Sequence, residues 1–153
     1  MRLYHFTTRH LAGMILTGTP SLDHGWPLGV TLARPDLWLT EEDRFPTDIT
    51  FTSTYKGKSA DYSTVRLALD LPDDAPLTPW WELAKGSTSI EGRLLASIAE
   101  RSRLWHVHAG TVAPDRIAEV AFRESSGGYR PATDAEVDEL QAWKDEDVEL
   151  ICR

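Results

Sequence analysis

Hydrophobic and polar positions alternate most clearly over residues 64–71. Aliphatic side chains occupy every second position there: Val65, Leu67, Leu69 and Leu71. The positions between them hold Arg66, Ala68 and Asp70. Because successive side chains of a strand point to opposite faces, the pattern predicts a strand with one buried and one polar face.

Shorter apolar segments predict further strands, at residues 3–6, 37–40, 104–109 and 117–123, with a last edge strand at 148–152. Gly127-Gly128 predicts a turn at 125–130, because glycine adopts the backbone angles that tight turns need. The polar segment 41–62 is compatible with a mobile loop or with an irregular hairpin. Residues 19–35 are rich in glycine and proline, which predicts a loop.

Helical spacing appears first at residues 9–16, where Leu11, Met14 and Ile15 fall on one face. Thr7 or Thr8 is the expected N-cap, and Gly18 suits the C-terminal end. Residues 89–100 show a second such pattern.

Two other helices are predicted from their start signals. Thr78-Pro79 precedes residues 80–85, and proline is favoured at a first helical position. Thr133 stands three residues before Glu136, the spacing of a capping box, and an apolar stripe of Val137, Leu140 and Trp143 follows. Strands and helices therefore mix irregularly, which predicts an α+β fold in a single domain over residues 1–153.

Composition narrows the class of protein. The 153 residues are 41% hydrophobic and 26% charged, as in ordinary globular proteins. No apolar run reaches the roughly 18 residues of a membrane span, and no signal peptide is evident at the N-terminus. The single cysteine, Cys152, rules out an internal disulfide and favours the reducing cytoplasm. A net charge of −8 argues against general binding to a nucleic-acid backbone.

Three strand segments carry candidate chemistry. His5 lies between apolar neighbours on the first strand, and Arg66 lies on the polar face of the clearest strand, where its guanidinium suits a phosphate. His106 and His108 share one face of a strand. Such a pair binds a metal only with a third ligand, and the sequence offers no obvious one, so we predict a polar wall with acid–base use and no metal.

The order of these segments resembles the ADP-ribosyltransferase superfamily. Residues 3–7 (Leu-Tyr-His-Phe-Thr), followed by a short helix and Gly18, are similar to the opening of DarT-like DNA ADP-ribosyltransferases and of RNA 2′-phosphotransferases. Residues 37–40 resemble the second motif strand, and residues 105–120 resemble the late strand with its turn proline, Pro114. Small bacterial and phage proteins share this arrangement.

The resemblance implies a split β-sheet with short peripheral helices that holds NAD, as substrate, in a central cleft. His5 would bind the ribose beside the nicotinamide, next to Phe6 and Thr7. Trp38 and Thr40 would line the nicotinamide site. Arg66 would hold phosphate, and Trp105 and His106 would border the acceptor.

One departure from the family concerns the late strand. DarT-like members place a glutamate about eight residues before the turn proline, where this chain has His106. That glutamate normally stabilises the oxocarbenium-like transition state or orients the acceptor. Glu82, Glu100 and Glu119 are candidate substitutes.

Three functional hypotheses follow. The first is NAD-dependent ADP-ribosyl transfer, a glycosyl transfer, to an unidentified acceptor that is a protein, a nucleic acid or a small molecule, with His5, Arg66 and His106 as catalytic residues. The second is a non-catalytic acidic binding or inhibitor module on the same fold. The third is 2′-phosphotransfer from RNA, in which Arg66 and His106 would act without a glutamate.

Overall fold

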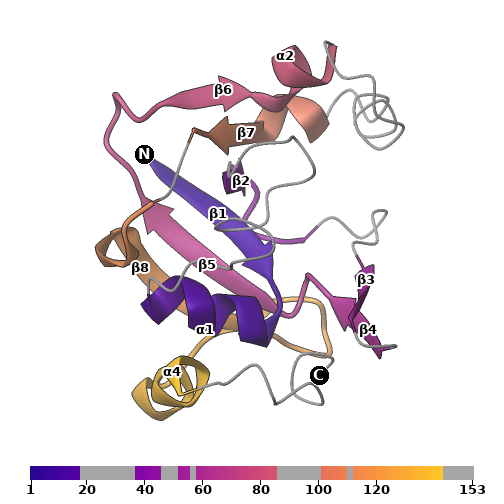
Figure 1. The fold of residues 1–153 in the computed structure, drawn as a ribbon, viewed down its shortest axis with the longest axis vertical. Helices are drawn as coiled ribbons and strands as arrows, with labels where there is room; N and C mark the ends of the chain where they lie inside the picture. Colours follow the sequence, from indigo (N-terminus) through magenta and orange to yellow (C-terminus); the bar gives the residue numbers. More distant parts are fainter. Residues whose placement is uncertain (18–36, 46–51, 56–57, 86–100, 110–111, 143–153) are drawn as a thin grey trace.

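A computed structural model of the chain describes residues 1–17, 37–45, 52–55, 58–85, 101–109 and 112–142 (Figure 1). The strands are β1 (Arg2–Thr7), β2 (Leu37–Thr40), β3 (Thr52–Tyr55), β4 (Lys58–Asp61), β5 (Val65–Asp70), β6 (Leu77–Pro79), β7 (Trp105–His108), β8 (Ile117–Arg123) and β9 (Tyr129–Pro131). The helices are α1 (Arg9–Thr17), α2 (Trp80–Lys85) and α4 (Asp134–Gln141), with short 3₁₀ turns η1 (Arg101–Leu104) and η2 (Pro114–Arg116). The fold is mixed α+β, as the pattern predicts.

Seven strands of the described segments form one antiparallel sheet in the order β6-β7-β2-β1-β5-β8-β9. β1 pairs with β5 along its whole length, from Arg2 to Thr7. It meets β2 at one pair only, Tyr4 with Thr40. The sheet is therefore narrow between β1 and β2, and in Figure 1 the β6-β7-β2 part lies at an angle to β1 and β5.

A continuous cluster of buried aliphatic side chains lies on one face of the sheet. Leu3, Leu39 and Leu67 point to that face and pack with Ala12 and Ile15 of α1. Figure 1 shows α1 lying across β5, with α4 beside it. We call this side the helix face. The opposite side, to which Tyr4, Arg66 and Glu119 belong by strand register, is called the arginine face.

α1 and α4 approach each other closely at Gly13. A Cβ atom at Gly13 would lie 2.1 Å from the carbonyl oxygen of Leu140, a distance that real side chains do not reach. The predicted caps hold both helices in place. Thr8 Oγ1 accepts from the Leu11 amide at 3.3 Å, and both hydrogen bonds of the Thr133–Glu136 capping box are formed.

Three predictions of local structure need correction. Thr78 and Pro79 belong to β6, and the helix begins at Trp80. Proline fits β6 because this strand lies at the edge of the sheet, where an amide donor is not required. Residues 129–131 form the short strand β9 after a turn in which Gly127 has φ 86°. Ala68, predicted on a polar face, is only 1% exposed.

The 41–62 segment contains the hairpin of β3 and β4, the second of the two predicted alternatives. Several predicted features lie outside the described residues: Gly18, the 19–35 loop, the 89–100 helix, Trp143 and the 148–152 strand. Within the described part, no helix combines the length and apolar character needed to cross a bilayer.

Candidate functional site

Strand register divides the predicted site residues between the two faces of the sheet. His5 pairs with Leu67 and His106 pairs with Leu39, and both partners belong to the core of the helix face. Arg66 pairs with Phe6 on the arginine face. The structure therefore brings the two histidines to one side of the sheet and places Arg66 on the other.

His5 lies deep on the helix face, with 4% of its surface exposed. It follows Tyr4, which pairs with Thr40, and Leu39 precedes Thr40 on β2. By alternation along β1 and β2, His5 therefore lies on the same face as Leu39 and His106.

His106 forms a pair with a carboxylate that directly follows β2. Its Nε2 atom lies 2.8 Å from Glu41 Oε1. The Glu41 amide also donates to the Leu104 carbonyl at 3.0 Å, which ties the end of β2 to the start of β7. The His106 side chain is 16% exposed and that of Glu41 is 51% exposed, so the pair is in reach of solvent.

The Glu41–His106 pair has the arrangement of an oriented base. An ionised carboxylate only accepts hydrogen bonds, so Nε2 of His106 carries the proton in this contact. In the neutral ring, Nδ1 is then the acceptor nitrogen. Among the described residues, His106 makes its hydrogen bond to Glu41 through Nε2, and none of them binds Nδ1. A histidine held by a carboxylate on one nitrogen and open on the other is suited to proton transfer.

Glu42 reaches the other face of the sheet. Its Oε2 atom accepts from Trp105 Nε1 at 3.3 Å, and its amide donates to Thr40 Oγ1 at 3.1 Å. Trp105 and Thr40 are both 0% exposed. These two predicted site residues are therefore buried on the arginine face, and the consecutive carboxylates Glu41 and Glu42 bind consecutive side chains of β7 on opposite sides.

Arg66 is fixed by several contacts on the arginine face. Nη2 donates to Glu119 Oε1, and Nη1 donates to the Asp43 carbonyl at 2.8 Å. The guanidinium carbon lies 5.1 Å from the Tyr4 ring centre and 5.3 Å from that of Tyr129, within the range of cation–π attraction. With its side chain 13% exposed, Arg66 makes these contacts with protein groups, and its contact with a phosphate stays a prediction.

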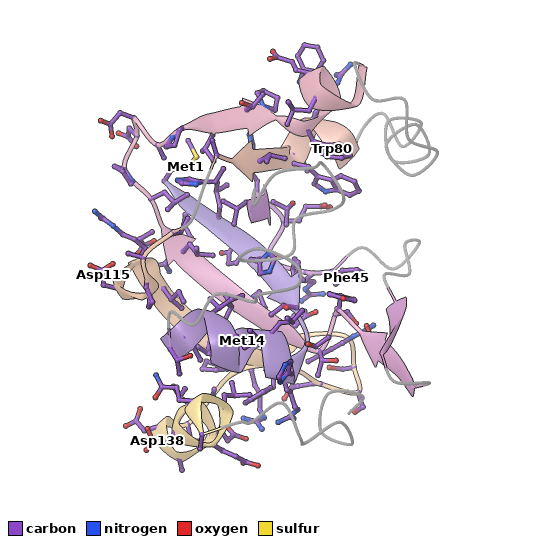
Figure 2. All side chains as sticks on the ribbon, in the orientation of Figure 1. Met1, Met14, Phe45, Trp80, Asp115 and Asp138 are labelled. Atoms are coloured by element: carbon purple, nitrogen blue, oxygen red, sulfur yellow. The ribbon has the colours of Figure 1, made fainter. Side chains whose placement is uncertain are left out.

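Aromatic rings surround this arginine. Phe6 packs edge-on against Phe45, with ring centres 5.3 Å apart, and tilts against Tyr129 at 5.4 Å. Figure 2 shows Phe45 beside the end of β1. Burial raises the pKa of Tyr129 to about 12, against the attraction of Arg123 for the phenolate, and its hydroxyl donates to the Ser63 carbonyl at 2.5 Å.

The remaining predicted residues are placed as follows. Thr7 is 1% exposed and pairs with Val65 on the helix face. His108 shares that face with His106, as predicted, because it pairs with Leu37. The side chain of Trp38 lies outside the described part. Among the residues that the structure places, no group of three possible ligands could hold a metal ion.

Glu41 is the carboxylate that sequence reasoning missed. Of the three candidates, Glu119 is bound to Arg66, Glu82 is exposed on α2, and Glu100 lies outside the described ranges. Glu41 was overlooked because its closeness to His106 depends on the pairing of β2 with β7. The available signal was the position of two glutamates directly after a predicted strand.

Comparison with known proteins returns no relative. No family model, no curated protein and no solved structure matches the chain.

Proposed function

We propose that the protein transfers ADP-ribose from NAD to an acceptor, with the Glu41–His106 pair as the catalytic base. The observation that carries the proposal is this accessible pair on the same face as His5. The narrow junction of β1 and β2 supports it too, because the resemblance to ADP-ribosyltransferases implies a split sheet.

In the proposed reaction the bond between the nicotinamide nitrogen and C1′ of the ribose breaks, and nicotinamide leaves with the bonding electrons. The acceptor oxygen or nitrogen forms a bond to C1′ and loses one proton. Nδ1 of His106 takes that proton, while Glu41 fixes the ring and offsets the charge that develops on it. A positioned base contributes typically about 10² to 10⁴-fold in rate.

His5 keeps the ribose contact that the resemblance implies. His5 is only 4% exposed, unlike the accessible Glu41–His106 pair. Its contact with the ribose is therefore tested by a variant of its own. Thr40, Trp105 and Arg66 are not assigned to NAD, since they lie on the other face and bind protein groups. Phe6 packs there as well.

The positions of Arg66 and His106 bear on the 2′-phosphotransferase hypothesis, and the exposed carboxylates of α4 bear on the hypothesis of an acidic binding module. The 2′-phosphotransferase hypothesis needs Arg66 and His106 at one site, and they face opposite sides of the sheet. The acidic binding module rests on exposed carboxylates such as Asp134, Asp138 and Glu139 of α4. A charged face does not identify a partner, so this hypothesis becomes an outcome of the experiment below.

The experiment measures NAD binding by calorimetry and nicotinamide release in the presence of protein, DNA and RNA acceptors. We expect binding at NAD concentrations up to the millimolar range and release with one acceptor class. His5→Gln should weaken binding about 10-fold, the loss of one good hydrogen bond. Absence of both binding and release at millimolar NAD would refute the proposal and leave the binding module as the better hypothesis.

A further inference from the structure

We infer that Arg66 is a positioning residue, which sets Glu41 against His106 from the opposite face of the sheet. This inference rests on the proposed function for its catalytic consequence, but its structural part stands on contacts alone. Arg66 does not touch either residue of the pair; it acts through the short segment that follows β2.

The segment of residues 41–45 is held by several contacts, among them the Trp105 indole on Glu42 and the Phe6 ring on Phe45. Its start is tied by the Glu41 amide to Leu104 and by the Glu42 amide to Thr40. Its middle is held by Arg66, whose Nη1 donates to the Asp43 carbonyl at 2.8 Å. The two amide contacts lie next to β2, at Glu41 and Glu42. The Arg66 contact, at Asp43, lies farther from β2 than either of them.

The arginine is itself held rigidly. Glu119 of β8 binds its Nη2, and the rings of Tyr4 and Tyr129 lie against the guanidinium. Its Nε atom is buried without a hydrogen-bond partner. Leaving a buried donor unpaired costs free energy, so the side chain is placed for its two Nη contacts at the expense of the third nitrogen.

These contacts give a path from β8 to the catalytic pair. Glu119 fixes Arg66, Arg66 fixes the Asp43 carbonyl, and Asp43 stands two residues from Glu41. A lysine at position 66 could keep one of the two contacts, because an ammonium lacks the planar fork of a guanidinium. Substitution of Arg66 on the arginine face should therefore change the orientation of Glu41 on the helix face.

The test observes the His106 ring by NMR, with the full chain and without NAD. The ring resonance is assigned with His106→Gln, and Glu41→Gln defines its position when the carboxylate contact is weakened. We expect Arg66→Ala to move the resonance toward the Glu41→Gln position and Arg66→Lys to move it part of the way. Arg2→Ala is the matched control: it removes another arginine of the same face, paired at 2.8 Å with Asp70, and should leave His106 unchanged.

Turnover provides the second arm. Arg66→Ala should lower kcat about 10-fold with KM within about 3-fold, and the double variant with Glu41→Gln should be no slower than Glu41→Gln alone, as for residues that act as one unit. If Arg66→Ala does not fold, Arg66→Lys decides. An unchanged His106 resonance in a folded Arg66 variant overturns the inference. A shifted resonance in a protein that never cleaves NAD would support the positioning role and refute the proposed reaction.

Discussion

The two faces of the sheet are built from the same strands but held by different forces. The helix face is closed by aliphatic packing, with Leu3, Leu67 and Val65 at 0–1% exposure beneath α1. The arginine face is closed by rings and charges around Arg66. The accessible Glu41–His106 pair belongs to the helix face by register.

The charged residue Arg66 and the candidate catalytic base therefore lie on different faces of the sheet. Arg66, which the sequence predicts to hold a phosphate, makes an ion pair with Glu119 and a hydrogen bond to the Asp43 carbonyl on the arginine face. The apolar face carries the candidate base at its β7 end, where the histidine lies beside Leu39. A charged residue on the polar face of an alternating strand is thus as suited to holding another segment of the protein as to binding a ligand.

The largest expected effect is on the packing of the helix face. Leu67→Ala removes a side chain that is 1% exposed in the core and should lower the free energy of unfolding by about 3 kcal/mol, as for other buried leucines. Urea denaturation measures this loss. Leu104→Ala, at a position 37% exposed, should cost less than about 1 kcal/mol. Equal losses would show that the helix face is not the main core.

The next effect tests how closely α4 covers that face. Gly13→Ala places a methyl group against the Leu140 carbonyl, where the Cβ would lie at 2.1 Å. The helices must separate, and we expect a loss of about 2 kcal/mol, typical of overpacking. Gly128→Ala is the control, because its nearest atom lies 3.7 Å away. A Gly13 variant as stable as the Gly128 variant would contradict this close approach.

The sequence predicts the parts of the fold that depend on local pattern. β2 and β8 have the predicted bounds, and β5 begins and ends within one residue of its alternating pattern. The Thr133 cap is confirmed because its signal lies within four residues. In each case the determining contacts are near in sequence.

The rest depends on contacts between distant segments. Ala68 is buried because β1 and β8 flank it and the arginine face is covered as well, which its own strand cannot show. Pro79 enters a strand because β7 pairs with it. The Glu41–His106 pair follows from the register of β2 and β7, across 65 positions of sequence. That Arg66 and His106 lie on opposite faces likewise could not be predicted before the sheet order was known.

A smaller effect is expected at the cap of α4. Thr133→Ala removes the acceptor for the Glu136 amide and should cost about 1 kcal/mol. Thr133→Ser keeps the hydroxyl and should stay near the wild-type value. Thermal or urea unfolding distinguishes the two variants, and an equal loss in both would show that the hydroxyl is not the stabilising group.

The smallest effect is a pH dependence on the arginine face. Burial raises the pKa of Tyr129 from 10.0 to about 12. The folded state therefore disfavours the phenolate, so the stability that Tyr129 contributes is complete below pH 10 and is lost as the pH rises toward about 12. Unfolding measured across this window should show a steeper decline in the wild type than in Tyr129→Phe. Identical slopes would contradict the burial of this ring.

The most direct measurement compares two neighbouring carboxylates that serve opposite faces. Glu41→Gln removes the charge that holds His106, and Glu42→Gln changes its neighbour while keeping an oxygen for the Trp105 indole. Nicotinamide release from NAD should fall about 100-fold or more in Glu41→Gln, within the range for loss of a positioned base, and stay within about 3-fold in Glu42→Gln. Equal rates in the two variants would contradict the assignment of the catalytic base to the Glu41–His106 pair.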